Sequence, residues 1–112
     1  MSKPKNQDIN VGQTRIDIQT LNKARDVIRA INNPVRKEII RLLEKHKQLD
    51  VSGIQKEAKI KTQTETSQSL AILRNCNVIQ SRTEGKYRFY SLNREAIANI
   101  AALIEELSKH AK

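Results

Sequence analysis

The 112-residue sequence predicts a mainly helical domain that contains one small β-hairpin. Two observations lead to this prediction. Apolar residues recur every three or four positions through most of the chain, which is typical of helices with one buried face. In 78–92 the spacing changes to two, on either side of the turn residues Glu84 and Gly85, which is typical of a hairpin. A chain of this length is the size of one ordinary domain.

The first third of the chain predicts a tail and one long helix. Residues 1–12 are polar, so we expect a flexible tail before a single domain that spans 13–112. Apolar residues at helical spacing predict a helix within 13–31, beginning near Thr14. Its stripe consists of Leu21, Ala24, Ile28 and Ile31, with Val27 beside it.

Asn33 and Pro34 predict the start of a second helix. Asn is a favoured N-cap, and Pro fits the first helical position because its missing N–H has no helical partner there. The helix is expected to end near His46. Its apolar stripe is Val35, Ile39, Leu42 and Leu43.

Two further helices, separated by a tight turn, are predicted in 52–75. Residues 52–55 have the form of a capping box, and so do residues 62–65. They predict a brief helix ending near Ala58 and a longer one ending near Asn75, which together form a helix-turn-helix. The other parts are a small strand at 48–51, a turn at 59–61, and a buried stripe of Thr66, Leu70 and Leu73.

A wing and a last helix complete the prediction. Strands at 78–82 and 86–92 make the hairpin 78–92, and Asn93 is a good cap for a final helix over 94–109. A hairpin directly after a helix-turn-helix forms a wing. The predicted fold is therefore a winged helix-turn-helix flanked by two long helices. The last helix carries the stripe Ile97, Ile100, Ala101, Ile104 and Leu107.

The charge pattern favours a polyanionic partner. The chain has 21 basic and 12 acidic residues, a net charge of +9. The positive charge is spread through 1–94, whereas 95–112 holds three acidic and two basic residues. This pattern suits a protein that meets nucleic acid with one surface and another partner with its C-terminal segment. A well-solvated basic protein is the alternative.

Several classes of protein are disfavoured. No apolar run approaches the roughly 20 residues of a membrane-spanning helix. The N-terminus lacks the apolar stretch of a secretory signal, so we expect a cytoplasmic protein. No nucleophile with a neighbouring base is recognisable, and three glycines do not make a phosphate-binding loop, so we expect no enzyme.

A set of residues across the predicted helix-turn-helix and wing carries a resemblance to a known family. The set comprises Asn33, Pro34, Val35, Arg36, Ile39, Leu42 and Leu43; Leu49, Val51, Ile54 and Ala58; Thr62, Gln63, Thr64, Ser67 and 70–74; and Arg82, Gly85, Tyr87, Tyr90 and Leu92. It resembles the ArsR-type winged helix-turn-helix repressors. The resemblance implies a bacterial, DNA-binding transcription regulator that acts as a homodimer, with 13–31 and 94–109 as its dimerisation helices.

Residues that the family's metal sensors use are missing at the matching positions. Metal-sensing relatives carry a cysteine pair near the short helix, where 49–53 holds none, or Asp and His ligands on the last helix, where the first turn is 93–96. The chain has one cysteine, Cys76, and two histidines, His46 and His110. We therefore expect no metal and no other cofactor. Cys76 is expected to fill a small slot where the recognition helix ends, and a redox role is the alternative.

Polar residues off the buried stripe of the longer helix are candidates for reading bases, because Gln pairs with adenine and Ser or Thr bonds base edges or phosphates. Basic residues at its end and on the wing are candidates for phosphate contacts. The candidate DNA-binding residues are Thr62, Gln63, Thr64, Ser67, Gln68, Arg74, Arg82, Lys86 and Arg88, with Arg36, Lys37, Lys59 and Lys61 as secondary candidates. The alternatives are an ordinary solvated helix face and charges that protect a sheet edge.

The two long outer helices carry more apolar residues than a monomer of this size needs. A dimer would bury the excess, double the phosphate contacts and match a palindromic site. The candidate interface residues are Leu21, Ala24, Ile28, Ile97, Ile100, Ile104 and Leu107. Packing of the same residues within one chain is the alternative.

Two other functions compete with sequence-specific binding to duplex DNA. A winged-helix protein-interaction module would display an apolar or acidic recognition helix, whereas this one is polar and lies in a basic region. A reader of single-stranded RNA would display exposed aromatic residues, and aromatic residues make up only 3% of the chain. Both are disfavoured. The effector is unknown from the sequence.

Overall fold

The computed structural model describes residues 9–11 and 14–109. Five helices and five strands follow one another in this described part: β1 (Ile9–Val11), β2 (Thr14–Ile16), α1 (Ile18–Ile31), α2 (Pro34–His46), β3 (Leu49–Asp50), α3 (Val51–Ala58), α4 (Gln63–Asn75), β4 (Ile79–Glu84), β5 (Tyr87–Leu92) and α5 (Arg94–Lys109). The winged helix-turn-helix is confirmed. None of these helices combines the length and apolar character needed to cross a membrane.

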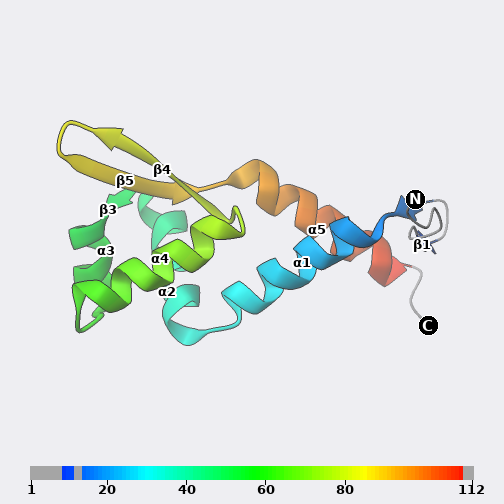
Figure 1. The fold of residues 1–112 in the computed structure, drawn as a ribbon, viewed down its shortest axis with the longest axis horizontal. Helices are drawn as coiled ribbons and strands as arrows, with labels where there is room; N and C mark the ends of the chain where they lie inside the picture. Colours follow the sequence, from blue (N-terminus) through cyan, green and yellow to red (C-terminus); the bar gives the residue numbers. More distant parts are fainter. Residues whose placement is uncertain (1–8, 12–13, 110–112) are drawn as a thin grey trace, which may run out of the picture.

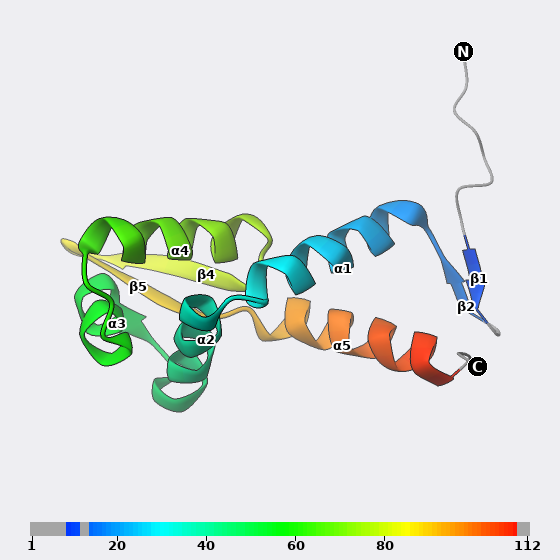
Figure 2. The ribbon, with the colours of Figure 1, turned by 90° about the horizontal axis from the view of Figure 1, so that it is seen from below.

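The elements form a body and an arm (Figures 1 and 2). The body holds α2, α3, α4 and the sheet of β3, β5 and β4. The arm consists of α1 and α5, which run side by side away from the body in both views. The two outer helices therefore project from the helix-turn-helix instead of wrapping around it.

Three helix starts follow from local capping, as the sequence predicts. Asn33 Oδ1 accepts a hydrogen bond from the Arg36 amide at 3.0 Å at the start of α2. Thr62 Oγ1 accepts from the Glu65 amide at 3.0 Å at the start of α4. At the start of α5, the Asn93 side chain accepts from an amide in the first turn at 3.2 Å. Each cap satisfies an amide that has no partner within its helix.

The start of the short helix differs from the prediction. Helix α3 begins at Val51, and its cap is Asp50, whose Oδ1 accepts from the Gly53 amide at 2.9 Å. The interpretation of 52–55 as a capping box was wrong, because Ser52 already lies inside the first turn. Asp50 and Ser52 both have side chains that can cap a helix, and the carboxylate that ends β3 is the one that bonds an amide of the first turn.

The start of α1 also differs. The helix begins at Ile18, not near Thr14, because Asp17 Oδ1 accepts from the Thr20 amide at 2.6 Å. The preceding residues of the predicted helix form β2, which pairs antiparallel with β1. Strand β1 uses three residues of the predicted tail; the rest of 1–12 lies outside the described residues.

The sheet has the order β3-β5-β4 and is antiparallel throughout. The hairpin turns at Gly85, whose φ of 62° is a conformation that glycine adopts without strain. Strand β4 extends to Glu84, two residues beyond its predicted end. Only two residue pairs join β3 to the hairpin, Leu49 with Tyr90 and Asp50 with Phe89.

The core lies between the three body helices and one face of this sheet. Most of the predicted stripes of α2 and α4 is buried, namely Ile39, Leu42, Leu43, Thr66, Leu70 and Leu73, whereas Val35 in the first turn of α2 is only half-buried against this core. Ile54 of α3 and Ile79 of β4 complete the centre. Burying each of the isoleucine and leucine side chains stabilises the fold by about 1.5–3 kcal/mol. Helix α4 is thereby held firmly along one face.

Candidate nucleic-acid interface

Helix α4 presents a polar face to solvent. Its buried residues are Thr66, Ser69, Leu70 and Leu73. The predicted stripe did not include Ser69, which is only 7% exposed. The predicted reading residues Gln63, Thr64, Ser67 and Gln68 are all exposed. Because residues four apart share a helix face, Thr64 and Gln68 lie together on the side away from the core.

The turn before α4 adds positive charge at its N-terminus. Lys59 ends α3 in the left-handed conformation, with φ 57°. Ile60 is 8% exposed and anchors the turn in the core. Lys59, Lys61 and Thr62 are exposed at the surface. The unpaired amides at a helix N-terminus also favour anions, so this corner suits a phosphate.

The wing has two different faces, which follow from its register. Residues opposite each other in an antiparallel pair share a face. Thr83 pairs with Arg88, and both lie on the face that carries buried Tyr90 and Ile79. We call this the inner face. Lys86 lies in the turn and is exposed.

The outer face of the wing holds Arg82, opposite Phe89. The Arg82 side chain has three partners: its Nη1 donates to Glu84 at 3.0 Å, its Nη2 donates to Gln48 at 2.9 Å, and its guanidinium carbon lies 5.3 Å from the centre of the Phe89 ring. Arg82 and Arg88, both candidates for phosphate contacts from the sequence, therefore lie on opposite faces of the wing.

The remaining basic candidates are more scattered. Arg74 is exposed in the last turn of α4, well away from Gln63 at the other end of the helix. Arg36 is half-buried, and its Nε donates to the carbonyl of Ala30 in the last turn of α1. That guanidinium is therefore partly engaged within the chain. Lys37 is exposed on α2.

The arm carries the predicted interface residues, and most of them are open to a partner. Ile28 and Ile104 are 44% and 42% exposed, and Leu21, Ile100 and Leu107 are half-buried. Ala24 is only 6% exposed, so it is packed within the protomer and offers no surface. Ile97 packs against the core of its own chain.

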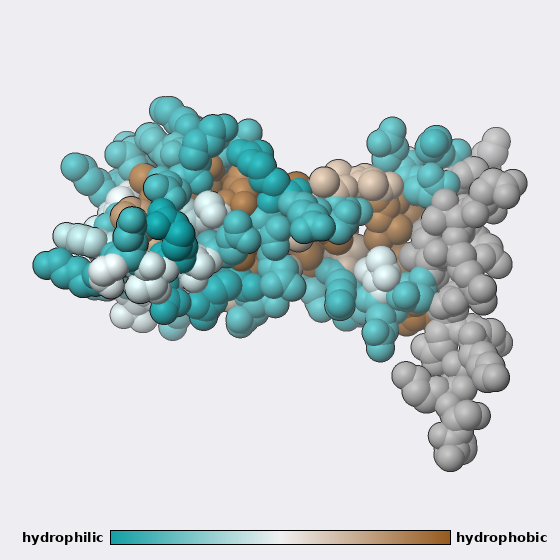
Figure 3. Space-filling model, turned by 90° about the horizontal axis from the view of Figure 1, so that it is seen from above, coloured by the Kyte–Doolittle hydropathy of each residue, from teal (hydrophilic) through white to brown (hydrophobic). Residues whose placement is uncertain are grey.

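An apolar groove runs along the arm. It has a volume of about 200 Å³ and is lined only by apolar residues. Brown atoms gather along the arm in Figure 3, beyond the mostly teal body. The residues that line this groove include Val27, Ile31, Ile40, Ile100, Ala101 and Ile104.

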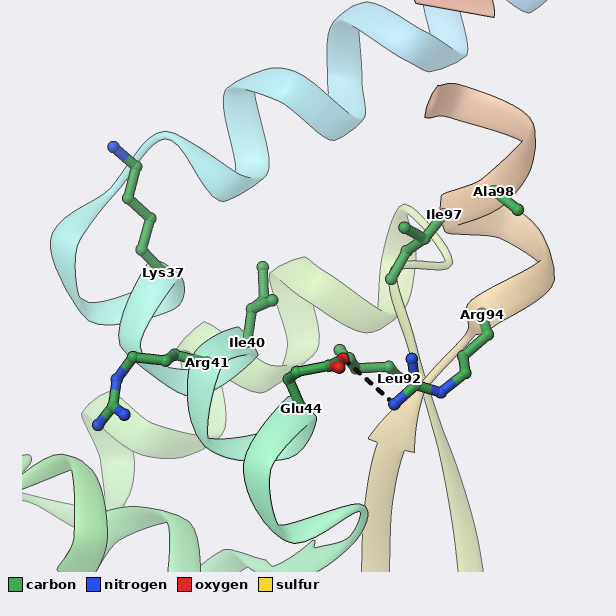
Figure 4. A pocket seen from close by; sticks show the side chains of 8 residues that line it. All are labelled: Lys37, Ile40, Arg41, Glu44, Leu92, Arg94, Ile97 and Ala98. Carbon is green, nitrogen blue, oxygen red and sulfur yellow. Dashed lines mark ion pairs between the residues drawn. The ribbon is translucent and has the colours of Figure 1, made fainter. Parts of the chain in front are cut away.

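A second hollow lies where the arm meets the body, between α2 and α5 (Figure 4). Ile40, Leu92 and Ile97 line it, and Arg94 lies 3.1 Å from Glu44 at its edge. Both charged side chains are more than half exposed, at 57% and 60%. Such an ion pair stabilises little, so the packing of Ile97 against the core holds this end of α5 more strongly than the ion pair does.

Comparisons with known proteins agree with this geometry. The profile of the arsR family of bacterial regulatory proteins matches residues 33–81. An uncharacterized HTH-type transcriptional regulator of Methanocaldococcus jannaschii is 32% identical over 85 residues, which cover 76% of this chain and 94% of the relative. The chain belongs to the ArsR family of transcriptional regulators. The comparisons give no support to the protein-interaction alternative.

Solved structures of the family share the fold. HlyU from Vibrio cholerae, in its reduced form, has 29% identity and a TM-score of 0.62, covering 76% of this chain and 88% of its own. The transcriptional repressor PagR of Bacillus anthracis has 27% identity and a TM-score of 0.65, covering 78% and 99%. An ArsR-like regulator from Rhodococcus sp. RHA1, at 17% identity, has a TM-score of 0.73 and covers 82% and 85%.

This ArsR-family chain has no candidate metal centre in its described part. No three residues of the types His, Cys, Asp and Glu come together there in a way that could hold a metal ion. Cys76 is half-buried at the end of α4, and its thiol donates to the Leu73 carbonyl at 3.4 Å. His46 ends α2 and is exposed, and His110 lies outside the described residues.

Proposed function

We propose that this regulator is a homodimeric repressor that reads duplex DNA by placing α4 in the major groove. The observation that supports this proposal most is the exposed polar face of α4. The opposite face of α4 is buried and holds the helix rigidly, and the polar face lies next to a basic turn and the wing. Thr64, Gln68, Gln63 and Ser67 would contact base edges. Thr62 and the nearby α4 amides would hold a phosphate.

The wing would contact the flanking backbone. Arg88 and Lys86 supply positive charge on the inner face and in the turn, and Arg74 supplies it at the end of α4. These contacts would position the protein on DNA without reading the sequence. Arg82 is left out of this set because its side chain is engaged on the outer face. No catalytic role is inferred, and the protein would act in the cytoplasm.

A second copy would cover the arm. The exposed Ile28 and Ile104, together with the apolar groove that Ile104 lines, are unusual on a protein surface unless a partner packs there. A winged helix-turn-helix domain of Mb0332 from Mycobacterium bovis, at 24% identity, was solved as a homodimer. Two copies joined by their arms would present two α4 helices to successive major grooves, roughly 34 Å apart.

Sedimentation of an arm variant tests this function. Ile104→Glu places a charge in the proposed interface, so it is expected to sediment as a monomer and to lose about tenfold or more of the affinity for duplex DNA, since a dimer binds with two linked modules. Ala102→Glu, on the exposed side of the same helix, is the matched control and should remain a dimer. A monomeric wild-type protein that binds DNA with the affinity of Ile104→Glu would contradict the dimer.

A further inference from the structure

The backbone pairing between the wing and β3 is short. Two residue pairs link β3 to β5, whereas six link β4 to β5. The outer half of the hairpin extends beyond β3 (Figure 1). A two-stranded hairpin has little stability of its own in water. Side-chain contacts that tie the hairpin to β3 therefore affect where its tip lies.

One arginine makes such a contact across the whole sheet. Arg82 belongs to β4, Phe89 to the central strand β5, and Gln48 directly precedes β3. The Arg82 guanidinium passes over the Phe89 ring at 5.3 Å and bonds Gln48 Oε1 at 2.9 Å, between residues 34 positions apart. Glu84 holds the guanidinium from the side of the turn at 3.0 Å. Three strands are thus connected on the face that does not pack on the core.

This connection reaches the helix-turn-helix directly. Strand β3 ends at Asp50, which caps α3 through the Gly53 amide at 2.9 Å. Helix α3 in turn packs against α4 through the core. The base of the hairpin is held in the core by Ile79, Tyr90 and Leu92. Its outer half is linked to the recognition helix through β3 and through the contact that Arg82 makes beside it.

We propose that Arg82 is a positioning residue, which holds the wing through Gln48 and Phe89 so that Arg88 on the opposite face can reach a phosphate. This proposal rests on the proposed DNA-binding function. It assigns Arg82 a role that differs from the phosphate contact expected from the sequence. The Arg82 guanidinium gives one N–H to Glu84 and one to Gln48, which hold its side chain on the outer face. Arg88 makes no side-chain hydrogen bond or ion pair within the described part of the chain, so it can turn toward a phosphate without losing a partner.

The salt dependence of DNA binding separates the two roles. A lost phosphate contact lowers the slope of log affinity against log salt by about 0.9 for B-DNA. A displaced wing withdraws Arg88 from its phosphate, so the slope falls even in a variant that removes no charge. The measurement is the affinity for one duplex of about 30 base pairs, close to three helical turns, over a range of salt concentrations.

Four variants are compared on that duplex. Gln48→Ala removes no charge, but we expect it to weaken binding about threefold, the size of one exposed charged contact, and to lower the slope, because Arg88 loses its phosphate when the wing moves. Arg82→Lys keeps the charge but cannot span the same partners, so we expect the same loss of affinity and the same lowered slope. Arg82→Gln and Arg88→Gln should match these two variants within error. Full affinity in Arg82→Lys with a lowered slope in Arg82→Gln would overturn the proposal.

A double variant tests whether the contact acts through Arg88. If the wing is displaced in Gln48→Ala, Arg88 no longer reaches its phosphate. Gln48→Ala combined with Arg88→Gln should then lose less affinity than the product of the two single losses. Independent, multiplicative losses would contradict the proposed route.

Hydrogen exchange of the free protein gives a reading that needs no DNA. Gln48→Ala should raise the exchange rates of the hairpin amides by about threefold and leave those of α2 unchanged, because only the wing loses a partner. A wild-type protein that binds no duplex would contradict the proposed function, and this measurement would still decide the role of Arg82. Unchanged exchange rates of the hairpin amides would overturn the positioning role of Arg82.

Discussion

Single residues on the DNA-facing side differ in what they can recognise. Gln68 lies on the exposed face of α4, where both the donor and the acceptor of its amide are available. Lys86 lies at the wing turn, and its ammonium is 5.8 Å from the centre of the Tyr87 ring. A side-chain amide can distinguish adenine from other bases, whereas an ammonium recognises a phosphate wherever it lies.

Substitution of these two residues should therefore have different effects. Gln68→Ala is expected to reduce discrimination between the preferred duplex and a duplex changed at one base pair by about 1–3 kcal/mol. Lys86→Ala should weaken binding to both duplexes by the same factor. Competition titrations with the two duplexes measure this difference. Equal, uniform losses in both variants would mean that α4 does not read bases through this face.

Residue roles are predictable from sequence only where the neighbours are local. The exposure of Gln63, Thr64, Ser67 and Gln68 follows from helical periodicity, so these positions could be predicted. The hydrogen bond of Arg82 with Gln48 could not be predicted, because Gln48 is distant in sequence and comes near only through the sheet. The one available signal is alternation in the hairpin, which places Arg82 and Arg88 on opposite faces once the register is known.

At the scale of elements, caps determine where the helices begin. Asn33, Thr62 and Asn93 each bond an amide three residues ahead, and these starts were predictable because the chemistry is contained in four residues. The start of α1 was not predictable, because residues 14–16 pair with residues 9–11 in a sheet and do not form the first turn of the helix. The start of α3 was misplaced because Asp50 and Ser52 both have capping side chains.

The cap of α1 should respond to acid. The hydrogen bond from the Thr20 amide, followed by that from the Thr20 side chain, lowers the pKa of Asp17 below its ordinary value of 3.8. A carboxyl whose pKa is lower in the folded state stabilises the fold above its unfolded pKa, and this contribution is lost as the pH falls through the folded value. The first turn of α1 is therefore expected to fray below pH 3.8.

Amide chemical shifts of α1, recorded while the pH is lowered, measure this fraying. Asp17→Asn is the control, because Asn caps a helix at any pH. The wild-type shifts of the first turn should change in this acidic range, and those of the variant should not. The same acidic change in both proteins would mean that Asp17 does not hold the start of α1.

At the scale of the whole molecule, the candidate DNA-binding surface and the apolar groove lie in different parts. The body carries the basic turn, the polar face of α4 and the wing, together with exposed Ile72, whereas the arm carries exposed Ile28 and Ile104 and most of the apolar groove. The sequence predicted this division from the low charge of 95–112 and the stripes of the outer helices. It could not predict that Ala24 is covered by its own chain, because that depends on how α1 packs.

Selection of bound duplexes from a random DNA pool tests most directly whether two α4 helices, held by one pair of arms, read DNA together. We expect enrichment of an inverted repeat whose half-site centres are one helical turn apart, about 10–10.5 base pairs, or a whole number of turns apart. Enrichment of a single, asymmetric site, or no enrichment above the starting pool, would contradict it.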